Sequence, residues 1–97
     1  MTELNHLAET LDALGHPLRL KILAQLTDKE LYLNEIANKT GISRALAKVH
    51  LKKLERAGLV KSRVEVIEGE AKALRYYKLL DFEIHVSPKT LKMEVKK

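Results

Sequence analysis

Apolar residues recur with the period of an α-helix over residues 43–57, where the division between two faces is sharpest. One face carries three apolar residues, Ala47, Leu51 and Leu54. The opposite face carries Ala45, Lys48, Val49, Lys52 and Arg56. Ser43 is a favourable N-cap and Gly58 a favourable residue just beyond a helix C-terminus, so both ends of the periodic segment are marked. The pattern predicts an amphipathic helix that packs with one face and exposes the other.

The exposed face of this predicted helix is strongly basic. Its single acidic side chain, Glu55, is outnumbered by five basic ones, Arg44, Lys48, Lys52, Lys53 and Arg56. A basic helix whose other face is anchored can enter the major groove of DNA, whereas an isolated basic helix is more often only a solvated surface. The neighbouring elements decide between these two interpretations.

Two further helices are predicted before the basic one. Pro17 stands at a first helical position, where its missing N–H costs nothing. The helix that follows is expected to direct Arg19 and Lys21 away from its core face, which contains Leu18, Ile22, Leu23 and Leu26. After a very short extended piece, Asn34 is expected to cap a brief helix that stops at Gly41. Two helices joined by a tight turn, the second of them basic, form a helix-turn-helix.

Beyond Gly58 the apolar period changes to two, which is typical of half-buried β-strands. The two strands predicted within residues 60–79 form a hairpin, and its turn and loop contain Glu68, Gly69, Glu70, Ala71 and Lys72. A hairpin that directly follows a helix-turn-helix is a wing. Its basic residues Arg63, Lys72 and Arg75 are placed to contact phosphate or an adjacent minor groove. Tyr76 and Tyr77 point to opposite faces of a strand, and we expect one of them in the core.

Four leucines near the N-terminus follow spacings of three, four and three: Leu4, Leu7, Leu11 and Leu14. This short heptad seam predicts an amphipathic helix over residues 2–14, closed by Gly15. A leucine seam at the end of a small domain can pack on its own core or against a second subunit. The seam alone leaves both arrangements open.

The C-terminal segment contains two more alternating runs, Phe82, Ile84 and Val86, followed by Leu91, Met93 and Val95. They flank residues 87–90, whose Ser-Pro-Lys-Thr sequence suits a turn, so the pattern predicts a second β-hairpin rather than a terminal helix. Together with the leucine seam, these apolar faces exceed what one small core needs. We expect them to form the subunit interface of a homodimer.

Composition and charge narrow the class of protein. A chain of 97 residues that is 45% hydrophobic and 32% charged is a single globular domain. Without cysteine, a membrane-length apolar run or a recognisable leader, we expect a cytoplasmic protein. The net charge of +5 is uneven, because residues 1–42 hold four basic and six acidic side chains, and residues 43–97 hold fourteen and seven. With 4% aromatic residues, double-stranded DNA is a better partner than single strands held by base stacking.

Enzymatic and metal chemistry find little support in the sequence. There is no GxSxG motif, no phosphate-binding glycine loop and no convergent carboxylate pair, so we expect neither an enzyme nor a cofactor. The histidines are His6, His16, His50 and His85. Only His16 has a partner at ligand-like helical spacing, Asp12, and Gly15 interrupts that helix, so we expect no metal site. His50, at the edge of the buried face of the basic helix, is expected to be structural or to contact phosphate.

The segments HPLRLKIL, from residue 16, and LYLNEIANKTGISRALAKVHLKKLERAGLVKSRV, from residue 31, resemble ArsR-like winged helix-turn-helix transcription regulators, particularly the compact archaeal kind. The resemblance extends over residues 11–80 and includes the His50-Leu51 pair and the closing AGLV. It implies a homodimeric regulator that inserts residues 43–57 into the major groove. The family's usual DNA-contacting positions are occupied by Ser43, Arg44, Ala45 and Lys48. Val49 replaces a commoner polar residue, and contact with a thymine methyl is its physical substitute.

These inferences predict an α+β, mainly helical fold, a single winged helix-turn-helix domain with an extra N-terminal helix and a C-terminal β-hairpin. Residues 1–15 would form a dimerisation helix, residues 16–80 the DNA-binding core and residues 81–97 the C-terminal strands. The predicted function is sequence-specific binding of double-stranded DNA by a homodimeric transcription regulator that reads an inverted repeat. A general chromatin-type DNA binder and a winged helix that binds only protein are the alternatives.

Overall fold

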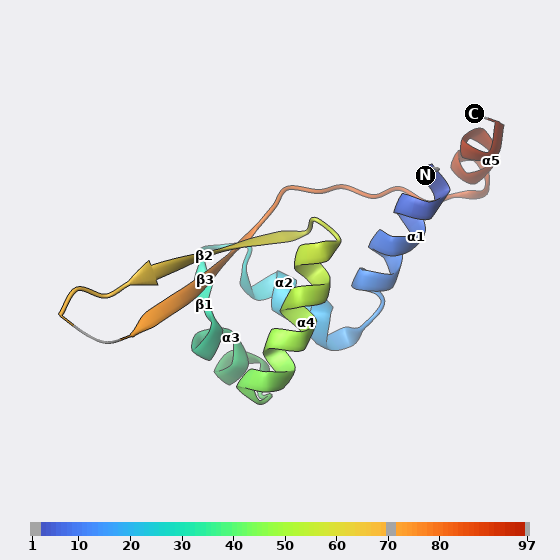
Figure 1. Cartoon of the computed structure of the whole chain (residues 1–97). Helices are drawn as coiled ribbons and strands as arrows, with labels where there is room; N and C mark the ends of the chain where they lie inside the picture. The colour runs from blue at the N-terminus through green and yellow to red at the C-terminus, as the bar shows by residue number, and fades with distance from the viewer. Residues whose placement is uncertain (1–2, 70–71, 97) are drawn as a thin grey trace.

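The computed structural model describes residues 3–69 and 72–96, and within these ranges it contains five helices and a three-stranded antiparallel sheet (Figure 1). The helices are α1 (Glu3–Leu14), α2 (Pro17–Gln25), α3 (Leu33–Thr40), α4 (Arg44–Arg56) and α5 (Pro88–Lys96). The strands are β1 (Leu31–Tyr32), β2 (Val60–Val66) and β3 (Ala73–Leu79). The expected helix start at Thr2 and the turn residues Glu70 and Ala71 lie outside the described residues.

The sheet has the order β1-β3-β2, so β3 is its central strand. Leu31 pairs with Tyr77 on one side of β3, and Val60 pairs with Leu79 on the other. The β2–β3 hairpin predicted as a wing is therefore confirmed. It projects from one end of a molecule that measures 57 × 24 × 23 Å, while α1 and α5 lie at the opposite end (Figure 1).

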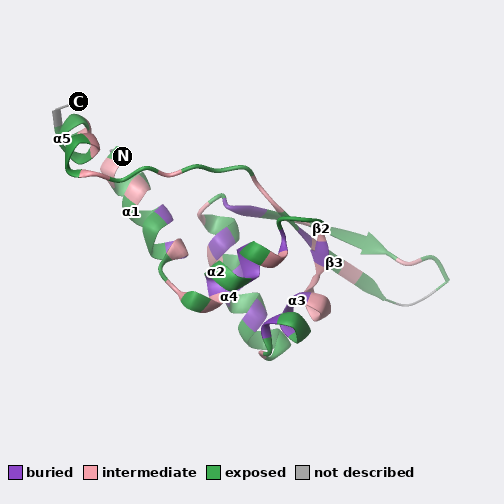
Figure 2. Cartoon of the chain, turned by 180° about the vertical axis from the view of Figure 1, so that it is seen from behind, coloured by how far each residue is buried: buried purple, intermediate pink, exposed green. Residues whose placement is uncertain are grey.

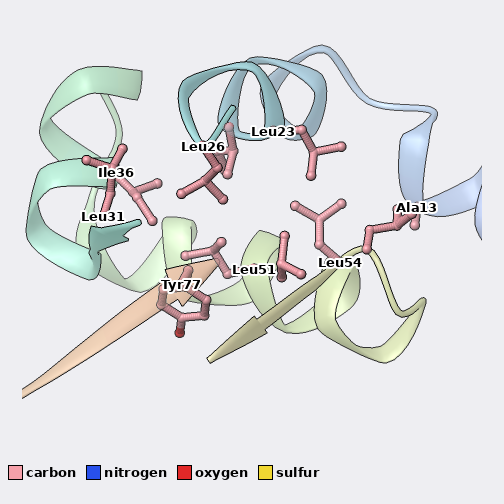
Figure 3. Packing of buried hydrophobic residues seen from close by; sticks show 11 residues of the cluster. Ala13, Leu23, Leu26, Leu31, Ile36, Leu51, Leu54 and Tyr77 are labelled. Atoms are coloured by element: carbon pink, nitrogen blue, oxygen red, sulfur yellow. The ribbon is translucent and has the colours of Figure 1, made fainter. Parts of the chain in front are cut away.

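The hydrophobic core lies between α2, α3, α4 and the sheet (Figure 3). Its largest fully buried side chains are Ile22, Leu31, Ile36, Leu51, Leu54 and Val60. Each lies at a position that the helical or alternating period assigns to the inner face of its element. Tyr77 is buried and Tyr76 only half-buried, so the expectation that one tyrosine belongs to the core is confirmed.

Helix α1 contributes little of its leucine seam to this core. Its buried residues are Thr10 and Ala13, and Leu14 packs against the core from its edge. Leu14, expected in a subunit interface, thus packs against the core of its own chain. Leu4 and Leu7 are half-buried, and Leu11 is 40% exposed. Most of the seam therefore stays at the surface.

The C-terminal β-hairpin predicted from the sequence is wrong. Residues 80–87 extend along the molecule without joining the sheet, and α5 follows them beside the N-terminal part of α1 (Figures 1 and 2). The Ser87 hydroxyl accepts a hydrogen bond from Thr90 N at 3.2 Å, and the Thr90 hydroxyl accepts one from Ser87 N at 2.9 Å. With Pro88 at the first helical position, these reciprocal bonds cap and start a helix where alternation suggested a turn.

Residues 80–95, including their apolar members, are exposed or half-buried along the whole segment (Figure 2). Ile84 is half-buried, and the exposed members are Phe82, Val86, Leu91, Met93 and Val95, of which Val95 is 70% exposed. An extended segment and a helix therefore take the place of the predicted strands. Most of their apolar residues are still exposed, as the sequence predicted for the strands.

Candidate nucleic-acid interface

Helix α4 begins and ends where its capping residues predict. Ser43 has extended backbone and its hydroxyl accepts a hydrogen bond from Leu46 N at 3.1 Å, which satisfies one of the free N–H groups of the first turn. The hydroxyl hydrogen of Ser43 is still available for an external acceptor. At the other end, Gly58 has φ of 77°, a left-handed conformation that favours glycine. Both predicted helix ends are confirmed.

The two faces of α4 also divide as predicted. Ala47, Leu51 and Leu54 are completely buried. The outward face exposes Ala45, Lys48, Val49, Lys52 and Arg56, with Arg44 at the start of the helix. Because the buried face fixes α4 against α2 and α3, the basic face is held in one orientation.

A tight turn connects α3 to α4. Gly41 ends α3 with φ of 77°, Gly41 N donates to Ala37 O at 2.9 Å, and Ile42 N donates to the same oxygen at 3.1 Å. Helix α3 begins at Leu33 rather than after a cap at Asn34, because Tyr32 N finds its acceptor in the Glu35 carboxylate at 3.1 Å. The predicted start lies two residues too late, but the helix-turn-helix arrangement itself is confirmed.

Three cations from two elements surround a shallow hollow between the start of α4 and the wing. Arg44 and Lys48 come from α4 and Arg75 from β3, and the hollow has a volume of about 160 Å³. The Arg75 guanidinium donates to the Ser62 hydroxyl at 3.0 Å, and that hydroxyl donates to Glu55 at 2.9 Å. These bonds tie the root of the wing to α4. The grouping of cations makes the space beside the start of α4 positively charged, which favours the approach of DNA.

Lys53 and His50, both predicted DNA contacts, lie on the side of α4 that faces α1 and α2. The Lys53 ammonium is 2.7 Å from the Asp12 carboxylate, and this hydrogen bond and charge lower the pKa of Asp12. His50 is buried. The structure thus favours the structural role over the phosphate contact for His50, and separates both residues from the outward basic face.

A buried polar cluster joins α1, α2 and α4, and Arg19 lies at its centre. Arg19, expected to point away, is only 8% exposed. It donates from Nε to Ala13 O at 2.6 Å, from Nη2 to Asp12 O at 3.1 Å, and lies with Nη1 3.1 Å from His50 Nδ1. The His16 ring lies 4.7 Å from the His50 ring and its Nδ1 accepts from Leu18 N. The available signal was the spacing of Arg19 from the core residues of α2, which places it on their face.

The His50 environment predicts a pH-dependent stability. Burial lowers the pKa of His50 from its ordinary 6.5, and the charges of His16, Arg19 and Lys53 lower it further. An unfolded chain binds a proton at His50 more readily than the folded one. The contribution of neutral His50 to the stability of the fold is therefore complete above about pH 6.5 and is lost as the pH falls through the lowered pKa. Urea unfolding at about pH 7.5 and about pH 5.5 should show this loss.

Two variants isolate that contribution. In His50→Asn the amide oxygen still offers Arg19 an acceptor but does not titrate, so this variant should lose less stability at acid pH than the wild type. In His85→Asn, which alters an exposed histidine, the loss of stability at acid pH should match that of the wild type. Identical pH dependence in all three proteins would contradict the assignment.

Arg63, predicted to contact DNA from the wing, is held by acidic partners within the chain. Its guanidinium donates to Glu65 at 2.8 Å and to Glu30 at 3.3 Å, and it lies 4.7 Å from the centre of the Tyr76 ring. These hydrogen bonds, with Glu65 the stronger influence, raise the pKa of Arg63 well above its usual range. Lys72, beside the hairpin tip, is exposed. All three wing contacts stay predictions, and Arg63 would have to leave its acidic partners to reach DNA.

Within residues 3–69 and 72–96, no three histidine, aspartate or glutamate side chains lie close enough together to hold a metal ion. Asp12, which has ligand-like spacing from His16, forms its ion pair with Lys53. In the same part of the chain, no helix is both long enough and apolar enough to span a membrane.

A helix-turn-helix that is anchored by its buried inner faces and followed by a hairpin defines a winged helix-turn-helix DNA-binding domain. The model of a family described as a helix-turn-helix domain matches residues 14–63. The chain is also 37% identical, over 84% of its length and 83% of the relative, to an uncharacterised HTH-type transcriptional regulator of Methanocaldococcus jannaschii. It therefore belongs to the helix-turn-helix transcriptional regulators. Membership in this family makes it a DNA-binding regulator and not an enzyme.

Solved structures support the same assignment. One is the homodimeric winged helix-turn-helix DNA-binding domain of a possible ArsR-family regulator from Mycobacterium bovis, with 33% identity and a TM-score of 0.66 over 78% of this chain and 65% of that one. Another is NolR from Sinorhizobium fredii, with 31% identity and a TM-score of 0.66 over 94% of this chain and 79% of that one. The resemblance to ArsR-like regulators is confirmed.

Proposed function

We propose that this chain is a sequence-specific regulator that binds double-stranded DNA as a homodimer, with α4 in the major groove and the β2–β3 hairpin as its wing. The outward face of α4 carries this proposal. It presents Arg44, Lys48, Lys52 and Arg56 from a helix whose ends are capped and whose inner face is buried. A fixed basic helix of this kind fits the major groove, and cations at its sides reach phosphates.

The apolar surface at the far end of the molecule supports a dimer. The candidate interface consists of Leu4, Leu7, Leu11, Phe82, Ile84, Val86, Leu91, Met93 and Val95, which are half-buried or exposed. These residues lie on α1, α5 and the segment between β3 and α5, and both helices lie at the end of the molecule opposite the projecting hairpin (Figure 1). The similar Mycobacterium bovis domain is a homodimer. Two-fold symmetry through this surface would present two copies of α4 to an inverted repeat.

The experiment is an affinity series on an operator selected from random duplexes and on unrelated DNA. Arg44→Ala and Lys48→Ala should cost about 1 to 3 kcal/mol on the operator and less on unrelated DNA, because these cations stand at the start of α4 where bases are reached. Lys52→Ala and Arg56→Ala should weaken both duplexes alike and reduce the salt slope by about one unit each at most, because they neutralise phosphates.

Lys53→Ala is the matched control on the same helix. It removes the same kind of charge from a side chain that is paired with Asp12, so its effect on DNA affinity should be smaller than that of Lys52→Ala. Equal losses on operator and unrelated DNA for every substitution would indicate a general chromatin-type binder. A wild type without salt-dependent affinity for any duplex would indicate a winged helix that binds only protein.

A further inference from the structure

The centre of the outward face of α4 is apolar. Ala45 and Val49 lie one helical turn apart on this face, and both are exposed, Val49 to 65%. Lys48 lies beside them toward the wing, and Lys52 lies one turn farther along the helix. A β-branched side chain lowers helix propensity relative to alanine or lysine, and an exposed one gains nothing from packing. Helix stability therefore gives no reason for a valine at position 49.

We propose that this strip recognises the C5-methyl groups of thymine bases, an inference that rests on the proposed function and deepens it. The major groove presents hydrogen-bonding groups on every base pair and one apolar group, the thymine methyl. Ala45 and Val49 offer no donor or acceptor, so they would leave polar base edges unpaired but can cover a methyl group. The specificity of this chain at the centre of each half-site is therefore for thymine.

The cations around the strip indicate what it binds. Arg44 and Lys48 stand on the wing side of α4 next to Arg75, and Lys52 follows one turn along the helix. Phosphate contacts from Lys52 and Arg75 would hold α4 in the groove, where Arg44 and Lys48 reach base edges beside the strip. An apolar protein surface would lack the phosphates that these cations require. Duplex DNA satisfies both the apolar centre and its basic flank.

The test compares thymine with deoxyuridine, which differs only by lacking the methyl group. In the selected operator, each thymine of one half-site is replaced in turn, and the affinity of the wild-type protein is measured. Replacement of the one or two thymines under the strip should weaken binding about four-fold each, the effect of one buried methyl. Replacement of the other thymines should change little.

Protein variants assign the effect to the strip. Val49→Ala should weaken binding to the thymine operator and lose most of its sensitivity to deoxyuridine at the position that Val49 covers. Leu20→Ala, which shortens an exposed apolar residue on α2, should keep the full sensitivity. Because Val49 is exposed, its replacement leaves the core intact.

The outcomes separate this inference from the proposed function. A wild type that binds its operator specifically but is indifferent to every deoxyuridine overturns methyl recognition alone. Undiminished sensitivity in Val49→Ala overturns the assignment to this strip. A wild type with no sequence preference on any duplex, seen before deoxyuridine is introduced, overturns the proposed function and this inference with it.

Discussion

Replacement of Leu7 and Leu11 by glutamate together is expected to convert the protein to a monomer and to lower its affinity for an inverted repeat by roughly 10²- to 10⁴-fold. Burial of a leucine contributes roughly 1.5 to 3 kcal/mol, and a carboxylate in its place would have to be desolvated. The affinity falls because the second half-site is no longer bound intramolecularly. Analytical ultracentrifugation and gel shift measure the two effects.

Leu20→Glu provides the control for this prediction. Leu20 is 51% exposed on α2, outside the proposed interface, so this variant should remain dimeric and bind the operator normally. Circular dichroism of the double variant should show retained helix, because Leu7 and Leu11 are not buried in the core. A double variant that is still dimeric at micromolar concentration would place the interface elsewhere.

Arg19→Met is expected to lower the free energy of unfolding by about 2 to 4 kcal/mol, since buried polar groups without partners are costly. The substitution leaves two carbonyl oxygens at the end of α1 and His50 Nδ1 without their guanidinium donor. It also loosens the joint between α1 and α4. Urea unfolding at neutral pH measures the loss.

Lys39→Met, at an exposed cation of α3, is the comparison for this variant and should change stability by less than about 0.5 kcal/mol. If Arg19→Met were as stable as Lys39→Met, the buried cluster would contribute nothing to the fold. In that case the hydrogen bonds between Arg19 and α1 would not hold α1 in place.

The DNA-binding core could be predicted from the sequence because its determinants are local. The period of α4 places Ala47, Leu51 and Leu54 inside, Ser43 and Gly58 mark its ends, and Gly41 marks the turn before it. Each signal depends on a few neighbouring residues and on backbone preferences that tertiary contacts do not oppose. The change to a period of two after α4 is equally local, so the β2–β3 hairpin could be predicted as well.

The C-terminal helix escaped prediction because two periods compete there. Leu91, Met93 and Val95 alternate as in a strand, but Leu91 and Val95 are also one helical turn apart. The capping bonds between Ser87 and Thr90, with Pro88 at the first helical position, favour the helix. The segment also has no adjacent strand with which to pair in the described part of the chain.

The contacts that could not be predicted join side chains that are distant in sequence. Arg63 meets Glu30 across the sheet, Lys53 meets Asp12 on α1, and Arg19 lies against His50. Charge alone marks all of these cations as candidate DNA contacts or solvated residues. Only the packing of the elements shows which cations are paired within the chain and which remain available on α4 and at the root of the wing.

The most direct test of the central claim is a footprint on an operator obtained by selection from random duplexes. A homodimer that inserts α4 should select an inverted repeat and protect two major-groove segments centred about 34 Å apart, one helical turn. The Leu7→Glu, Leu11→Glu variant should protect neither segment at the same concentration. Selected duplexes without a shared motif, or one asymmetric protected segment bound by a single copy, would contradict the account.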